Sequence, residues 1–204
     1  MNTKTKKNCL GATVALLLAT MLAALLPTEA EARIYEDTLR LHILANSDSE
    51  EDQELKLEIR DKILEKYADR LKDSGNITEA ERIAGALLSD IERDAEEWVR
   101  ELGYDYPVTV TLTQEWYDTR EYEDFTLPCG YYDSLQVIIG SGGGKNWWCV
   151  MYPPLCMDIA TERAPVDDAA LNYTKEELML ISGKKYNIKF KILEIVSEAF
   201  AKNG

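Results

Sequence analysis

The chain has 204 residues, with 23 lysines and arginines against 37 aspartates and glutamates, and a formal net charge of −14 at pH 7. This acidic balance disfavours binding to nucleic acid or to anionic lipid, because their phosphate groups would repel the protein. The length predicts one domain with a single hydrophobic core.

Residues 1–32 are typical of an export signal. Three lysines precede an almost uninterrupted apolar run over residues 10–26, and alanines occupy both positions that a signal peptidase inspects, ending at Ala32. The alternative is a retained N-terminal membrane anchor, although this run is at the short end for a membrane span. We therefore expect an extracytoplasmic domain over residues 33–204, with membrane contact only through residues 10–26 if they are not cleaved.

The first predicted element of this domain is a strand. It covers residues 39–44, where Leu39, Leu41 and Ile43 alternate with other residues, which is typical of a strand with one inward face. Residues 46–49 then suit a turn and a helix cap.

Two long amphipathic helices are predicted next, because apolar side chains recur every three or four positions. The first covers residues 50–72, and the second runs from a capping box at Thr78 and Glu81 to Gly103. Their buried stripes are expected to be Leu55, Ile59, Ile63, Leu64, Tyr67 and Leu71 in the first helix, and Ile83, Leu87, Ile91, Ala95, Trp98 and Leu102 in the second.

Three further strands and a last helix complete the pattern. Apolar residues alternate with threonine over 108–113, while 135–139 and 147–152 enclose a glycine run and are predicted to pair as a hairpin. An irregular arm or short helix over 158–182 leads to a last amphipathic helix that ends at the chain terminus. Its apolar face is expected to be Ile188, Ile192, Ile195, Val196 and Ala199. The fold class is therefore α+β: a single domain, mostly antiparallel sheet with two long amphipathic helices after the first strand and a C-terminal helix.

The most specific segment runs from Pro128 to Cys156 and combines two adjacent tryptophans, three cysteines and a glycine run. Disulfides persist outside the cytoplasm, and two prolines would turn the chain so that Cys149 meets Cys156. The alternative is that these two and Cys129 are all small buried residues, because spacing does not decide connectivity.

Candidate catalytic residues are scarce. Cys149 with His42, the single histidine, is the pair that an exported Cys/His cell-wall hydrolase would use. A strand beside two tryptophans does not activate a thiol as a helix N-terminus would, so we interpret His42 as a strand residue that hydrogen-bonds locally. A Gly-x-Ser-x-Gly elbow is missing, the cysteine spacing does not match zinc, and Asn146 stands where a phosphate-binding loop needs Ser or Thr. The sequence predicts no enzyme, metal, cofactor or small-molecule substrate.

Two patterns have competing interpretations. Asp52, Lys56 and Arg60 repeat every four residues and form either a solvated charge ladder or a docking edge. Trp147 and Trp148 could form a wall-glycan-binding module, although adjacent strand residues point to opposite faces, so that only one ring could be exposed.

Two stretches resemble the stage II sporulation protein R family. The first begins with Leu39-Arg40-Leu41-His42-Ile43-Leu44-Ala45-Asn46-Ser47-Asp48-Ser49 and continues through Asp52-Gln53, Leu55-Lys56 and Arg60-Asp61. The second comprises Pro128-x-Gly130-x-Tyr132, Gly144-Lys145-Asn146-Trp147-Trp148-Cys149-Val150 and Pro153-Pro154-Leu155-Cys156. The similarity extends over residues 38–157.

This resemblance implies an exported signalling protein of endospore-forming bacteria. Such a protein is made in the forespore, is secreted into the intermembrane space and activates a membrane-embedded aspartic protease that matures the sigma-E precursor. Cys129 departs from the family pattern, so it could pair with either motif cysteine. The candidate partner-binding residues are then Arg40, His42, Asp52, Lys56, Arg60, Lys145, Asn146, Trp147 and Trp148.

Overall fold

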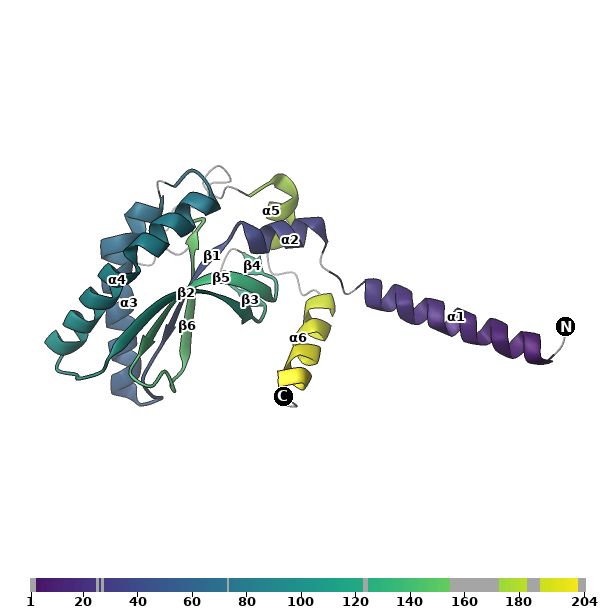
Figure 1. The fold of residues 1–204 in the computed structure, drawn as a ribbon, viewed down its shortest axis with the longest axis horizontal. Helices are drawn as coiled ribbons and strands as arrows, with labels where there is room; N and C mark the ends of the chain where they lie inside the picture. The colour runs from purple at the N-terminus through teal and green to yellow at the C-terminus, as the bar shows by residue number, and fades with distance from the viewer. Residues whose placement is uncertain are drawn as a thin grey trace.

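The computed structural model describes residues 3–24, 26, 28–72, 74–122, 125–154, 173–182 and 188–201. In this part of the chain a mixed sheet packs against two long helices (Figure 1). The predicted α+β class is confirmed.

Four strands form the main sheet, in the order β2-β5-β1-β6. They are β1 (Leu39–Leu44), β2 (Val108–Tyr117), β5 (Gly130–Ile139) and β6 (Asn146–Tyr152). β1 runs parallel to β5, while the β1–β6 and β2–β5 pairs are antiparallel, so the sheet is mostly antiparallel as expected. A separate small antiparallel pair is formed by β3 (Arg120–Glu121) and β4 (Thr126–Leu127).

The strands β5 and β6 do not form the predicted hairpin, because β1 lies between them. Their glycine-rich connection instead crosses the end of β1. There the N–H groups of Gly143 and Gly144 donate to the carbonyl oxygens of Asn46 and Ala45, at 3.2 and 2.9 Å. The prediction was wrong because a two-strand pattern says nothing about a third strand that inserts between them.

Helix α3 (Glu50–Lys72) has the predicted bounds and lies with α4 on one face of the sheet (Figure 1). Ser49 caps it, since its hydroxyl accepts the Asp52 N–H at 3.2 Å. Its predicted stripe is buried apart from Leu64, which is half-buried. Below it, Leu41 and Ile43 of β1 are fully buried.

Helix α4 (Ile77–Glu101) differs from the prediction at its start and on its buried face. Its N-cap is Asn76, which accepts the N–H of Glu79 at 3.0 Å, so the capping box at Thr78 and Glu81 was wrong. The inward apolar side chains are Ala80, Ala84, Leu87, Ile91, Ala95 and Val99. Small alanines let the helix approach its neighbours closely, and the face they select leaves Leu102 exposed.

The N-terminal segment forms two helices of different character. α1 (Thr3–Ala23) extends away from the sheet, whereas α2 (Glu29–Glu36) packs against α5 (Lys175–Ile181) and β5 (Figure 1). Helix α2 spans the predicted cleavage position after Ala32, and its Ile34 is fully buried. Among the described residues, no helix has both the length and the apolar character that a membrane span needs. Signal cleavage stays a prediction.

The last helix, α6 (Ile188–Ala201), presents a different face from the predicted one. Phe190 and Glu194 are buried, while Ile195 and Val196 are 58% and 41% exposed. Polar contacts select this face, since Glu194 accepts the backbone N–H of Thr119 at 2.9 Å. Of the predicted arm, residues 158–172 lie outside the described part, and α5 is a short helix as expected.

A buried carboxylate joins α3 to α4. Asp94 on α4 accepts hydrogen bonds from Lys66 and Tyr67 on α3, and Arg93 donates to it at 3.1 Å. Burial raises the pKa of Asp94, but these hydrogen bonds outweigh it and lower the pKa to about 2.

Because the unfolded pKa of an aspartate is about 3.9, the ionised Asp94 stabilises the fold above that pH, and this contribution is lost as pH falls towards about 2. We expect Asp94→Asn to lower the free energy of unfolding by about 2 kcal/mol at pH 7. The difference should shrink steadily in urea titrations between pH 4 and pH 2. A difference that stayed constant with pH would contradict this account.

Candidate functional site

The register of the sheet places one set of polar side chains on the face opposite α3 and α4. Arg40 and His42 on β1 lie beside Ser134 and Gln136 on β5, and His42 lies beside Trp148 on β6. Because side chains alternate along a strand, all of these point away from the Leu41 side.

His42 is the centre of this face. Its Nδ1 lies 3.1 and 3.0 Å from the two carboxylate oxygens of Glu115, and its Nε2 lies 3.1 Å from Oδ1 of Asn146. Its ring also stacks on Trp148, with the centroids 5.6 Å apart. These contacts agree with the interpretation of His42 as a strand residue that hydrogen-bonds locally.

Glu115 on β2 is the acidic member of this group. Burial raises the pKa of Glu115, but hydrogen bonds from His42, Ser134 and Tyr117 outweigh it and hold the pKa below its ordinary value. Gln136 also donates to this carboxylate. The ionised Glu115 therefore fixes the orientation of the imidazole.

A cation covers the ring of Trp148, which stacks on His42. The guanidinium of Arg120 on β3 lies 3.6 Å from the centroid of the Trp148 ring. Burial lowers the pKa of Arg120, and no group in the described ranges of the chain forms a hydrogen bond with its Nε. We call His42, Glu115, Arg120, Asn146 and Trp148 the His42 cluster; it is a partly exposed patch of charge and aromatic surface.

Arg40 lies on the same face of β1 as His42, and none of its surface is exposed. Its guanidinium lies 3.9 Å from the Tyr117 ring centroid and 5.1 Å from that of Tyr132, and its Nη2 donates to the Tyr122 hydroxyl at 2.7 Å. Its Nε and Nη1 have no hydrogen-bond partner among the residues that the structure describes. Within the described residues, no carboxylate forms an ion pair with it. Arg40 is therefore not part of the exposed surface of the cluster, and it reaches the cluster through Tyr117, whose ring contacts those of His42 and Trp148.

The other candidate residues gather at the start of α3. Lys56 Nζ donates to the Lys145 carbonyl oxygen at 2.9 Å, and Asp52 accepts from Asn46 and Ser47 at 2.9 and 2.6 Å. Asp52 and Lys56 are buried, so they are neither a solvated ladder nor an accessible docking edge. They hold the glycine-rich connection against β1 and α3.

The two tryptophans lie on opposite faces of β6, as their adjacency predicts. Arg60 on α3 lies 5.0 Å from the Trp147 centroid, and Arg120 covers Trp148. Both tryptophans are half-buried with a cation against one ring face. Neither presents the bare platform that stacking on a sugar would need.

Cys149 and His42 cannot act together, because the sheet separates them. Cys149 pairs in register with Leu41 and points to the helix side, while His42 points to the other side. Cys149 is also disulfide-bonded. Its predicted partner, Cys156, lies outside the described residues, so that pairing stays a prediction.

Cys129 is a free, buried thiol, so it is not the partner that the departure from the family pattern allowed. Burial raises the pKa of Cys129 to about 11, which keeps the thiol protonated and unreactive at neutral pH. In the part of the chain that the structure describes, no three His, Cys, Asp or Glu side chains gather as metal ligands.

Sequence reasoning missed three members of this face: Glu115, Tyr117 and Arg120. The one available signal was Glu115, a carboxylate within a strand otherwise rich in valine and threonine. Arg120 reaches Trp148 only through the fold, so its role had no local signal.

Taken together, the fold and the His42 cluster define a small α+β protein with a fixed polar and aromatic surface, in which the sheet separates His42 from Cys149. A family model described as Stage II sporulation protein R matches residues 35–162. The chain is 30% identical over 187 residues to the Stage II sporulation protein R of Bacillus subtilis (strain 168), covering 82% of this chain and 84% of that protein. This chain belongs to the stage II sporulation protein R family. No solved structure matches it.

Family membership supports a role in sporulation, and the family name points to a regulatory protein, not to a known enzyme.

Proposed function

We propose that this chain is an exported signalling protein that activates a membrane-embedded aspartic protease, which then matures the sigma-E precursor during endospore formation. The observation that carries the proposal is the family match, which extends over most of the chain. In this proposal the protein is made in the forespore and secreted into the intermembrane space, and the signal-like segment over residues 1–32 supports its export.

Two further observations support a ligand over a hydrolase. The sheet separates Cys149 from His42, and the His42 ring has a polar contact at each nitrogen. The His42 cluster is instead a rigid surface, because ring stacking and charge-assisted hydrogen bonds hold each of its members. A rigid, shaped surface is what an activating ligand needs, since little entropy is lost when it binds.

The test is genetic. In a strain that lacks the gene, we expect the sigma-E precursor to stay uncleaved during spore formation, as seen on immunoblots. A copy that encodes the full chain should restore cleavage, whereas a copy that lacks residues 1–32 should not, because it cannot be exported. Normal processing in the deletion strain would refute the proposal.

Mass spectrometry of the exported protein without reductant checks the route and the bridge together. We expect a mature N-terminus at Arg33 and a peptide in which Cys149 is joined to Cys156. An intact signal segment would support the anchored alternative.

A further inference from the structure

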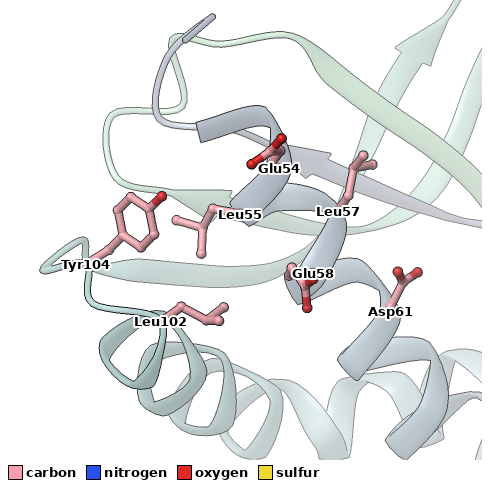
Figure 2. A pocket seen from close by; sticks show the side chains of 7 residues that line it. All are labelled: Glu54, Leu55, Leu57, Glu58, Asp61, Leu102 and Tyr104. Carbon is pink, nitrogen blue, oxygen red and sulfur yellow. The ribbon is translucent and has the colours of Figure 1, made fainter. Parts of the chain in front are cut away.

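A groove lies between the first turns of α3 and the chain that follows α4. Its volume is about 380 Å³. In Figure 2, Leu55 reaches from α3 towards Leu102 and Tyr104 on the other wall. The groove is lined by Glu54, Leu55, Leu57, Glu58, Asp61, Leu102 and Tyr104.

The apolar part of this groove is incompletely covered. Leu57 is 37% exposed and Leu102 is 40% exposed, although each belongs to a helix or its cap. Leu102 was expected to end the buried stripe of α4, but the observed face of that helix turns it towards solvent. Gly103, with φ +89°, then reverses the chain and keeps Leu102 at the rim.

The rim of the groove is acidic. Three of its seven lining residues are carboxylates, and no basic residue is among them. Asp61 is paired with Arg60 at 2.7 Å. Glu54 and Glu58 are exposed on the same helix face, one turn apart. The groove therefore combines apolar surface with negative charge that its own walls leave unneutralised.

A groove of this size holds a few side chains but not a whole helix, because a helix with its side chains is about 10–12 Å across. The matching occupant is a protein segment that inserts an apolar side chain between Leu55, Leu57 and Leu102. Lysines or arginines beside it would then reach Glu54 and Glu58. The net charge of −14 favours approach of such a cationic segment and disfavours an acidic one or a second copy of this chain.

We propose that this groove is the docking site for a basic, apolar segment of a partner protein. The proposal rests on the activator function only for the identity of that partner, because binding can be measured with purified protein. It places a partner contact on the helix side of the molecule, away from the His42 cluster.

The probe is a fluorescein-labelled peptide amide of sequence Lys-Leu-Lys-Leu-Lys, titrated with the full chain in fluorescence anisotropy. Glu54→Gln with Glu58→Gln should weaken binding about fivefold, and Leu102→Ser about tenfold. Matched controls are Glu65→Gln with Asp69→Asn on the same helix and Leu180→Ser on α5, which should leave binding unchanged.

A Lys-Ser-Lys-Ser-Lys peptide should bind at least about fivefold more weakly, because it lacks the apolar side chains. Equal binding of both peptides would overturn the proposal by showing attraction through net charge alone. Equal effects of the groove variants and their matched controls would overturn it as well.

The same variants separate this inference from the function proposed above. Loss of sigma-E precursor cleavage in a strain carrying Leu102→Ser, with export intact, would identify the protease as the partner at this groove. Normal cleavage together with weakened peptide binding would support the groove with a different partner. Normal cleavage in the full deletion refutes the activator function and leaves the peptide result standing.

Discussion

Replacing Gly144 by alanine should destabilise the domain by at least about 2 kcal/mol, because a Cβ at this position overpacks against a backbone that cannot move away. The added atom would lie 2.2 Å from the Ser47 carbonyl oxygen and 2.6 Å from its carbon. Ser47 is held in turn by its hydrogen bond to Asp52, at the first turn of α3. Relieving the overlap therefore means pulling the glycine-rich connection off the end of β1.

Gly143→Ala is the matched control. A Cβ at Gly143 would lie 3.4 Å from its nearest neighbours, which is ordinary contact. We expect this variant to stay within about 1 kcal/mol of the parent, helped by the smaller conformational freedom of alanine in the unfolded chain. Urea denaturation at constant m-value measures both free energies of unfolding. Equal stabilities of the two variants would show that close packing of the glycine-rich connection against the end of β1 does not require glycine at position 144.

The second large effect is expected at Arg40, where a substitution should stabilise the domain instead of destabilising it. Burying a cation costs several kcal/mol, and each of the two guanidinium nitrogens that have no partner among the described residues adds about 1–3 kcal/mol. The cation–π contacts with the rings of Tyr117 and Tyr132 stabilise the folded state by only about 2 kcal/mol each. Arg40→Met should therefore raise the free energy of unfolding by about 1–4 kcal/mol, since methionine fills much of the same space without charge.

Arg40→Ala separates charge from packing. It removes the same cation but leaves a cavity beside Tyr117 and Tyr132, so we expect it to lower stability by about 2–4 kcal/mol. If methionine destabilises as much as alanine does, the attraction between the rings and the cation outweighs the cost of burying the charge, and this account fails. Arg100→Met on the exposed side of α4 is a control that should change little.

A residue that lowers stability is retained where function needs it. On the function proposed above, we therefore expect the chain with Arg40→Met to support less cleavage of the sigma-E precursor in the deletion strain, despite its greater stability. Unchanged cleavage would show that Arg40 is not needed for signalling.

Much of the fold could be predicted because its signals are local. The bounds of β1 and α3 follow from alternation in one case and a 3.6-residue period in the other, and both are as predicted. The α4 cap was misplaced by two residues because Asn76 and Thr78 both suit a helix start. The face of α6 was misassigned because Glu194 binds the Thr119 backbone, a contact that periodicity cannot register.

The candidate site was less predictable. Nine residues were named from motifs and spacing, and the structure divides them between the two faces of the sheet. The charged row of Asp52, Lys56 and Arg60 has helical spacing that suits solvent exposure. Burial of the first two follows from the glycine-rich connection folding over them, which is a contact between segments far apart in the chain.

By itself, the sequence determined the types of element, the α+β class and the motifs that mark the family, because each depends on neighbouring residues or on identity at fixed spacing. Only the tertiary structure decided that β1 inserts between β5 and β6, that Cys149 and His42 lie on opposite faces, and that Arg40 is buried against two tyrosines. These features arise from pairing across long sequence separations. Strand order and register are selected by the packing of the whole core, which no local pattern encodes.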